Sequence, residues 1–219
     1  MTLSQRLIAE AIGTAFLLIA VVGSGIMAAN LSDGNIALAL LANAIATGVA
    51  LYVLITIFGP ISGAHFNPAV TLVFALRGEI ALHHAAAYVL VQIVAGILGV
   101  WLSHVMFDLP ILQASTTART GLSQWVAEIV ATFGLLITIL AGIRHAPAQV
   151  PALVAAYITG AYWFTASTSF ANPAVTIARA FSDTFAGIAP SDVLPFIAAQ
   201  IVGAVLAFGL ARILYAPNR

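Results

Sequence analysis

The chain has 219 residues, of which 62% are hydrophobic and only 6% are charged, and its mean hydropathy is +1.10. This balance is far from that of a water-soluble domain and predicts a protein of the lipid bilayer. A formal net charge of zero gives no sign of nucleic-acid binding, and the absence of cysteine excludes disulfides and thiolate metal sites.

Apolar runs of about 20 residues, long enough to cross a bilayer as helices, recur six times along the chain. The first contains Glu10, is longer than the core of a signal peptide and has no small-residue cleavage site, so we expect it to persist as the first helix. The six predicted spans cover residues 7–27, 36–58, 85–107, 125–143, 150–168 and 193–215.

The arginines are distributed unevenly over the predicted loops, and the chain contains no lysine. In a six-span arrangement Arg119 and Arg179 fall on one side of the membrane. Because positively charged loops stay in the cytoplasm, the richer side is expected to be cytoplasmic, together with both termini of a multi-pass protein of the cell membrane. The arginines of that side are Arg6, Arg77, Arg144, Arg212 and Arg219.

Three segments of the first half recur in the same order in the second half. AEAIGTAFLL from Ala9 returns as AEIVATFGLL from Ala127, FNPAVTL returns as ANPAVTI, and VQIVAGILG from Val91 returns as AQIVGAVLA from Ala199. We therefore expect one transmembrane domain, 1–219, made of two repeats, about 1–110 and 120–219. Because each repeat holds three spans, an odd number, the second repeat must be inverted relative to the first.

The tripeptide Asn-Pro-Ala occurs once in each repeat, before an apolar stretch too short to cross a bilayer, 69–76 or 174–181. Asn is a favoured N-cap and proline at the first helical position has no N–H to leave unsatisfied, so each motif predicts the start of a half-helix. Non-helical backbone at membrane depth must be buried in protein or line a watery cavity. Inverted repeats bring both positive helix ends together at a central passage. The motif residues are Asn67, Pro68 and Ala69 in the first repeat and Asn172, Pro173 and Ala174 in the second.

The segment SGAHFNPAVTL, the second Asn-Pro-Ala, the paired Ala-Glu motifs and the repeated glutamine of the third and sixth spans resemble the aquaporin, or major intrinsic protein, family over almost the whole chain. The resemblance implies an all-α membrane protein with six transmembrane helices and two re-entrant half-helices. It also implies a passive channel for water or small neutral solutes, usually a homotetramer with one pore in each subunit. No cofactor, metal site or enzyme activity is implied.

The resemblance gives roles to several polar residues. Asn67 and Asn172 are expected to donate amide hydrogens to the permeant, and the alternative is that both are helix caps only. Glu10 and Glu128 resemble buried glutamates that accept hydrogen bonds from the re-entrant loops, with a proton relay as the alternative. His65 resembles a residue beside the cytoplasmic half of the pore.

Selectivity in this family is set at a constriction on the outer side of the motifs. Spacing from the two motifs assigns Thr47, Gly160, Ser169 and Val175 to it, with one residue of slippage possible in the fifth span. Val175 stands where most members carry arginine, so the filter is expected to be wide and to lack a cation. Arg179 lies one turn beyond Val175 and is a candidate for the pore mouth, although we favour a pair with Asp183 or a bond to nearby carbonyls.

The stretch NPAVTIARAFSDTFAGI resembles a bacterial subgroup associated with arsenic resistance, so arsenite and methylated arsenicals join water and glycerol-like polyols as expected solutes. A proton-coupled secondary transporter also has inverted repeats and broken helices and is the alternative, but it needs a titratable group at the binding site. An enzyme is disfavoured because no nucleophile, metal cluster or acid–base pair converges on the predicted passage.

Overall fold

The long helices form where the hydropathy pattern predicts them. The computed structural model describes residues 1–215, so Arg219 lies outside the described part. No strand occurs within these residues. In chain order the helices are α1 (Leu3–Leu18), η1 (Ile19–Gly23), α2 (Ser24–Leu31), α3 (Ile36–Ser62), α4 (Pro68–Leu76), α5 (Leu82–Met106), α6 (Leu122–His145), η2 (Pro147–Gln149), α7 (Val150–Phe164), α8 (Pro173–Arg179) and α9 (Pro190–Leu214).

The first span is one continuous helix of 29 residues, Leu3–Leu31, that passes through a π-helical turn at η1. A π-helical turn shifts the backbone hydrogen-bond pattern and can leave a carbonyl in need of a donor. Asn43 of α3 supplies one, since its side-chain Nδ2 lies 2.8 Å from the carbonyl oxygen of Val21. A buried amide thus joins the first two spans at the turn.

Within residues 1–215, five helices are long and apolar enough to cross a membrane by themselves. The helix of the predicted fifth span, α7, has only 15 residues, or about 22 Å at 1.5 Å per residue. The prediction that this span reaches residue 168 is wrong, because α7 ends at Phe164 and Thr165 adopts an extended conformation with φ −113° and ψ 135°. The residues that follow form the loop that leads into α8.

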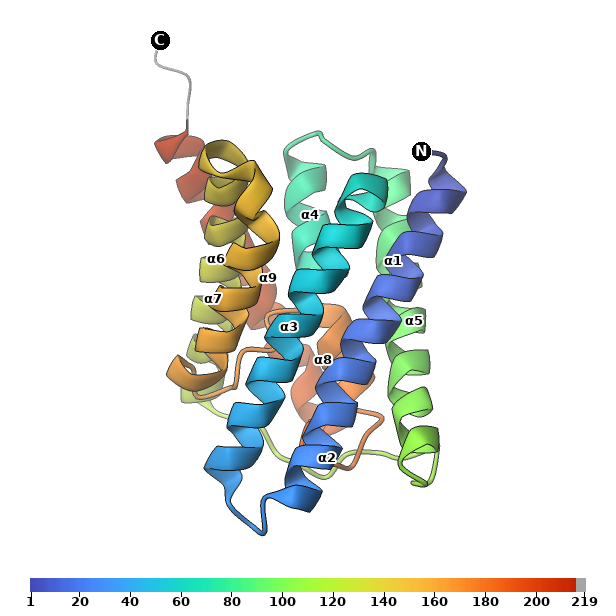
Figure 1. Ribbon diagram of the computed structural model, residues 1–219. Helices are drawn as coiled ribbons and strands as arrows, with labels where there is room; N and C mark the ends of the chain where they lie inside the picture. Colours follow the sequence, from blue (N-terminus) through green and yellow to red (C-terminus); the bar gives the residue numbers. More distant parts are fainter. Residues whose placement is uncertain (216–219) are drawn as a thin grey trace.

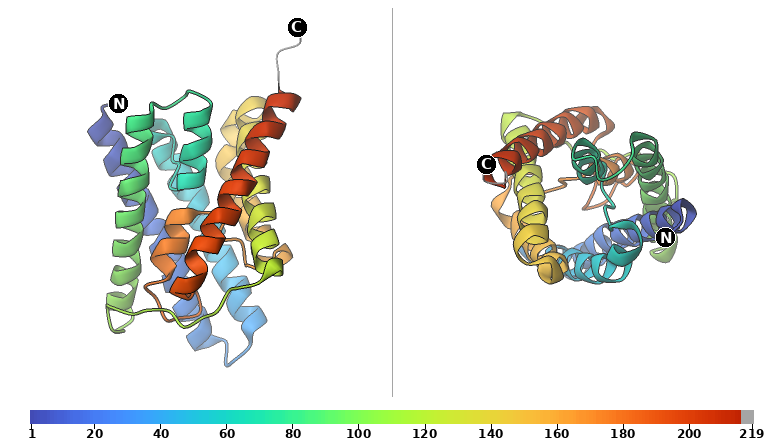
Figure 2. Two further views of the ribbon diagram at one scale, coloured as in Figure 1. Left: turned by 180° about the vertical axis from the view of Figure 1, so that it is seen from behind. Right: turned by 90° about the horizontal axis from the view of Figure 1, so that it is seen from above.

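Seen from above, the long helices form a ring (Figure 2). The N-terminus and the end of α9 lie at one end of the molecule, the terminal end, and we call the opposite end the distal end (Figure 1). The half-helix α4 occupies the terminal half and α8 the distal half, and both begin near the middle of the molecule. The two repeats are therefore inverted, and α1 packs on α5 in the first as α6 packs on α9 in the second.

Glycines allow these paired helices to approach closely. A Cβ atom on Gly203 of α9 would lie 2.5 Å from the carbonyl oxygen of Ile129 in α6, and a Cβ on Gly99 of α5 would overlap the carbonyl of Ala15 in α1. Without water to drive association, helices in a membrane depend on such close van der Waals contact. The four long helices that hold the half-helices are thereby fixed against one another.

We expect Gly203→Ala to lower the free energy of unfolding by about 1–3 kcal/mol, because the added methyl group overlaps the backbone of α6. Gly209→Ala is the matched control in the same helix, since a Cβ there meets nothing within 4 Å. Reversible unfolding in mixed detergent micelles, followed by circular dichroism, measures both. Equal stability of the two variants would contradict the close approach of α6 and α9.

Candidate pore

The two half-helices start in the same way. Asn67 is extended, with φ −158° and ψ 118°, and its Oδ1 accepts a hydrogen bond of 2.9 Å from the backbone N–H of Ala69. Asn172 has φ −159° and ψ 112°, and its Oδ1 accepts from the N–H groups of Ala174 at 3.0 Å and Val175 at 3.3 Å. Each asparagine therefore caps its helix with the side-chain oxygen, and the following proline occupies the first helical position.

The nitrogen of each asparagine side chain binds the opposite repeat. Asn67 Nδ2 donates to the carbonyl oxygen of Ala171 at 2.8 Å, and Asn172 Nδ2 donates to the carbonyl oxygen of Phe66 at 2.8 Å. Each acceptor is the residue just before the other asparagine. An amide nitrogen carries two hydrogens, so one N–H on each side chain remains for another acceptor. Both asparagines line the central cavity, where that acceptor would be a permeant.

The loop before α4 is held by the carboxylate of Glu10, which is fully buried in α1. Glu10 Oε1 accepts from the backbone N–H of His65 at 2.9 Å and from Ser62 Oγ at 2.6 Å. Glu10 Oε2 accepts from the N–H of Phe66 at 2.7 Å and from Gln92 Nε2 at 2.8 Å. Two backbone donors with no helical partner are thus satisfied at the depth of the half-helix start.

Glu128 of α6 makes the equivalent contacts in the second repeat. Its two carboxylate oxygens accept from the N–H groups of Phe170 and Ala171, both at 2.9 Å, and Gln200 Nε2 donates to Oε2 at 2.6 Å. Both glutamates are therefore surrounded by donors. This arrangement is that of an acceptor for the loops, and a proton relay would have to break it.

Several loop residues adopt left-handed backbone conformations that non-glycine residues rarely use. They are Ala64 and Phe66 before α4, and Thr168, Ser169 and Ala171 before α8, with φ between 47° and 61°. Each such residue costs about 1–3 kcal/mol and persists only when its surroundings hold it. The glutamate carboxylates, which bind Phe66 and Ala171 directly, supply part of that support.

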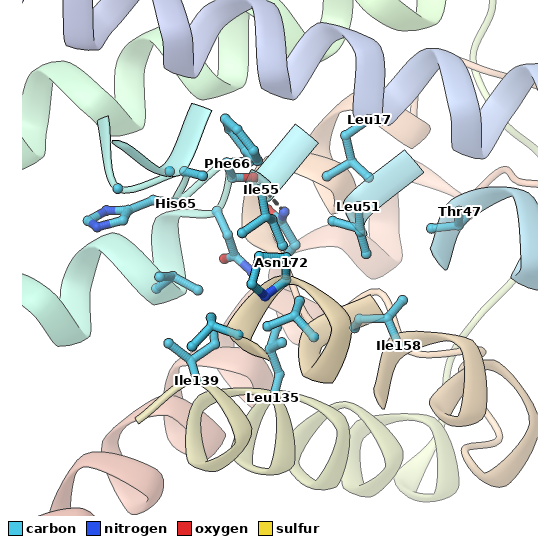
Figure 3. A pocket seen from close by; sticks show the side chains of 18 of the residues that line it. Leu17, Thr47, Leu51, Ile55, His65, Phe66, Leu135, Ile139, Ile158 and Asn172 are labelled. Carbon is cyan, nitrogen blue, oxygen red and sulfur yellow. Dashed lines mark hydrogen bonds between the residues drawn. The ribbon is translucent and has the colours of Figure 1, made fainter. Parts of the chain in front are cut away.

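The two motifs open onto a cavity of about 540 Å³. Figure 3 shows Leu17, Leu51 and Ile55 on one wall and Leu135, Ile139 and Ile158 on the facing wall, with Asn172 between them. His65 and Thr47 lie toward opposite ends of this row (Figure 3). The passage is therefore apolar over most of its wall, with polar groups at its ends and at the two motifs.

Three of the four residues assigned to the constriction line this cavity: Thr47, Ser169 and Val175. Thr47 Oγ1 lies 3.2 Å from the hydroxyl oxygen of Tyr162, which also lines it. Ser169 Oγ is buried and has no hydrogen-bond partner within residues 1–215. Val175 presents an apolar side chain with 5% of its surface exposed.

The assignment of Gly160 to the constriction is wrong. Gly160 is exposed on the outer face of α7, and it is not among the residues that line the cavity. The buried face of α7 instead carries Ile158 and Tyr162 into the cavity, four residues apart. Gly160 lies about 200° around the helix from either residue, at 100° per residue, and so points away. Sequence spacing missed Tyr162, because α7 is apolar almost all the way round and its sequence does not show which face is buried.

His65 lies at the terminal side of the motifs, where it lines the cavity. Its Nδ1 is 3.1 Å from Thr71 Oγ1, and its ring packs on Phe74 with ring centroids 4.6 Å apart. Thr71 also donates to the carbonyl of Asn67 at 3.0 Å. The imidazole is thus tied to the first turn of α4, on the terminal side of the motifs.

Arg179 also lines the cavity and does not pair with Asp183. Its Nε donates to the carbonyl oxygen of Ala186, seven residues further on. Asp183 instead accepts from the backbone N–H and the hydroxyl of Thr116, at 2.8 and 2.9 Å, and these bonds hold the pKa of its carboxyl below the usual value. The ion-pair alternative is therefore wrong, and the alternative of a carbonyl partner agrees with the structure.

Sequence reasoning also missed Phe170 and Arg119. Two guanidinium groups lie close to the Phe170 ring, whose centroid is 3.4 Å from Arg179 Cζ and 5.0 Å from Arg119 Cζ. Arg119 belongs to the loop between α5 and α6, where its Nε donates to the carbonyl of Gly187 at 2.7 Å. Burial lowers the pKa of Arg119. No local pattern predicts this cluster, because its members are far apart in the sequence.

Two inverted half-helices that meet end to end beside a lined passage, within a ring of apolar helices, define a membrane channel. Comparison with known proteins gives the family. The profile described as "MIP: Major intrinsic protein" matches residues 1–164, and the chain belongs to the major intrinsic protein family. The proteins of this family are passive membrane channels for water and small neutral solutes, not enzymes.

Two relatives and one solved structure place the chain within that family. It is 58% identical over 217 residues to "Aquaglyceroporin AqpS" of Rhizobium meliloti (strain 1021), which covers 99% of this chain and 93% of that protein. It is 34% identical over 144 residues to "Aquaporin NIP1-2" of Arabidopsis thaliana, a match that covers 62% of this chain and 48% of that protein. The X-ray structure of the aquaglyceroporin from Plasmodium falciparum has the same fold, with a TM-score of 0.76 at 20% identity over 99% of this chain and 98% of that one.

We expect Glu128→Ala to lower the free energy of unfolding by about 3 kcal/mol, because it leaves the N–H groups of Phe170 and Ala171 buried without acceptors. Glu79→Ala is the control, since Glu79 is an exposed carboxylate whose surface pair with Arg77 contributes little. Unfolding by sodium dodecyl sulfate in mixed micelles measures both. A loss in Glu128→Ala no larger than in Glu79→Ala would argue against the loop-holding role.

Proposed function

We propose that this channel selects solutes at its distal end through a permissive filter made by Thr47, Tyr162, Ser169 and Val175, and that it admits neutral solutes larger than water. The observation that carries the proposal is Val175, which directly follows the second motif and lines the cavity with an apolar side chain. A valine adds neither the bulk nor the hydrogen-bond donors of an arginine at this position.

The chemistry of the cavity favours small solutes with several hydroxyl groups. Hydroxyls from Thr47, Tyr162 and Ser169 can exchange hydrogen bonds with such a solute, and the leucine and isoleucine walls contact its carbon or methyl groups. Glycerol-like polyols, arsenite and methylated arsenicals share this description, because each is small, oxygen-rich and uncharged in at least one common form. The relative from Rhizobium meliloti is named an aquaglyceroporin, which supports the same solute class.

We further propose that the channel is a homotetramer in a bacterial cell membrane, with one pore in each subunit and both termini in the cytoplasm. Arg77 directly follows α4, Arg144 and Arg212 lie in the last turns of α6 and α9, and Arg6 lies near the start of α1, all at helix ends of the terminal end. Arg119, by contrast, lies in a loop of the distal end. Positive charge is thus richer at the terminal end, which favours a cytoplasmic location for it.

The alternative of a proton-coupled transporter has less support. Such a protein needs a titratable group at the centre of its binding site, and the groups that face the passage there are the two asparagine amides. The buried carboxylates of Glu10 and Glu128 are occupied by loop donors. Flux of water, glycerol, arsenite and methylarsonate into proteoliposomes, with and without a proton gradient, tests the proposal. Saturable flux that depends on the gradient would support the transporter instead.

We expect Val175→Arg to reduce the flux of glycerol and arsenicals much more than that of water. The ratio of large-solute flux to water flux should fall about tenfold or more. The guanidinium would narrow the constriction and add donors that must be satisfied, and water, the smallest of these permeants, needs the least room beside it. Stopped-flow light scattering of proteoliposomes gives both rates. Equal loss of both fluxes, or no loss, would remove Val175 from the size-selective constriction.

Val175→Met is the control for this substitution, because it lengthens the side chain without adding a charge or a donor. It should reduce large-solute flux less than Val175→Arg does. Both variants are compared at equal amounts of folded protein, since a new arginine one turn from Arg179 brings two like charges together.

We expect Asn172→Asp to raise the sodium and proton leak about tenfold, because a carboxylate attracts cations and cannot donate to the carbonyl of Phe66 when ionised. Asn35→Asp is the matched control, since Asn35 also caps a helix, α3, but lies at an exposed loop. Fluorescent dyes for sodium and pH inside vesicles report the leak. A leak that stays at the level of the unmodified channel would contradict a role for Asn172 in excluding ions.

A further inference from the structure

Arg179 is a buried cation without a carboxylate partner. Only 2% of its surface is exposed, and the one ion pair within residues 1–215 joins Arg77 and Glu79. A charged side chain inside a membrane protein is expensive unless it is paired, and those that persist commonly mark a pathway for ions or substrates. Only part of the Arg179 guanidinium has a protein partner. The position of Arg179 in the channel determines what its other N–H groups can bind.

The contacts of Arg179 leave part of its guanidinium without a protein partner within residues 1–215. The Nε atom is occupied by the carbonyl of Ala186, and one face of the guanidinium lies on the ring of Phe170. No hydrogen bond to Nη1 or Nη2 is present within residues 1–215, although Arg179 lines the cavity. An arginine carries five N–H donors, so most of them are left for a group inside the cavity.

Arg179 lies on the same face of α8 as Val175, because the two residues are four apart. It therefore stands about 6 Å further along the half-helix, toward the distal end. Ser169, whose hydroxyl has no partner, lines the same cavity. Within residues 1–215, the distal part of the passage thus combines a hydroxyl without a hydrogen-bond partner and a guanidinium whose Nη atoms have none.

Arg119 does not share this role. It is not among the residues that line the cavity, and its Nε binds the carbonyl of Gly187 while its backbone N–H binds Asp192 Oδ2 at 2.7 Å. Its guanidinium lies over the ring of Phe170, as that of Arg179 does. Arg119 therefore fixes the loops that support Phe170, and Phe170 in turn supports Arg179.

We propose that Arg179 is the specificity-determining cation of this channel, displaced by one turn of α8 from the position that Val175 occupies. Its charge excludes cations at the distal mouth, and its free N–H groups bind the oxygen atoms of neutral solutes such as polyols and undissociated oxyacids. Val175 leaves the constriction wide, and Arg179 keeps it selective by charge. This inference rests on the proposed function, because it assumes that solutes pass through the cavity.

The test uses the absence of lysine from the chain. Arg179→Lys keeps a positive charge at this position and makes it the only lysine of the chain. Acetic anhydride then acetylates this side chain and removes its charge. Urea and guanidinium are the permeants, because they have nearly the same shape and differ in charge. We expect the guanidinium-to-urea flux ratio in proteoliposomes to stay within about twofold of the unmodified channel in Arg179→Lys, and to rise about tenfold after acetylation.

Two controls accompany the test. The unmodified channel, treated with the same reagent, accounts for acetylation of the N-terminal amine. Arg77→Lys places a lysine after the other half-helix, at an exposed site outside the cavity, and its flux ratio should not change on acetylation. An unchanged ratio in acetylated, folded Arg179→Lys overturns the proposal, and so does an equal rise in Arg77→Lys. Mass spectrometry verifies that residue 179 is modified.

Arg179→Cys serves as a second variant if the lysine channel does not fold, since the chain has no other cysteine. Its flux ratio should be raised about tenfold and restored by 2-aminoethyl methanethiosulfonate, but not by the uncharged methyl reagent. The proposal is overturned if the guanidinium-to-urea flux ratio of Arg179→Cys is not raised, or if the charged reagent does not lower a raised ratio. If the unmodified channel passes neither water nor urea, the proposed function fails, whereas a working channel with an unaltered ratio contradicts the role of Arg179 alone.

Discussion

The structure depends on one constraint: two stretches of non-helical backbone lie at membrane depth, and each needs acceptors for N–H groups that no helix can satisfy. Glu10 and Glu128 provide them from the long helices α1 and α6. Because each carboxylate also binds a glutamine of a neighbouring long helix, the position of the loops is transmitted from the outer ring to the passage. The close contacts of α1 with α5 and of α6 with α9, which the glycines permit, keep those helices in place. The position of these loops places the residues that line the passage and the asparagines that cap the half-helices. It also places the residues proposed to select solutes.

The two repeats share this framework but differ in what they present to the solute. The terminal half carries His65, an imidazole tied to Thr71. The distal half carries hydroxyl groups and a buried guanidinium. An inverted repeat makes the scaffold symmetric, yet a solute meets different chemistry at each end. The asymmetry arises at positions that the scaffold does not need, such as Val175 and Arg179, because the carboxylate contacts and the caps involve other atoms.

Local patterns in the sequence predicted most of the fold, because hydropathy and the caps of helices depend on neighbouring residues. Helices form at all six predicted spans and α4 and α8 start where the motifs predict, but the fifth helix, α7, ends four residues early and is shorter than the other five spanning helices. Gly160 was misplaced because the direction in which α7 faces depends on its packing against α3 and α6. The loop between α7 and α8 also contains left-handed residues, whose path cannot be read from spacing. The pairing of Arg179 with Asp183 failed for a related reason, since a threonine 67 residues away in the sequence binds that carboxylate.

The reciprocal bonds between the two asparagines and the carbonyls of Phe66 and Ala171 have the geometry of an isologous contact, in which the same surface meets itself across a two-fold axis. Each half of the chain therefore acts toward the other as one subunit of a dimer acts toward its twin. In a true dimer, however, a single substitution changes both sides at once. Here the halves are covalently joined and encoded separately, so one side can change while the other keeps the interface. This freedom is what lets a symmetric junction stand beside a passage whose two ends carry different side chains.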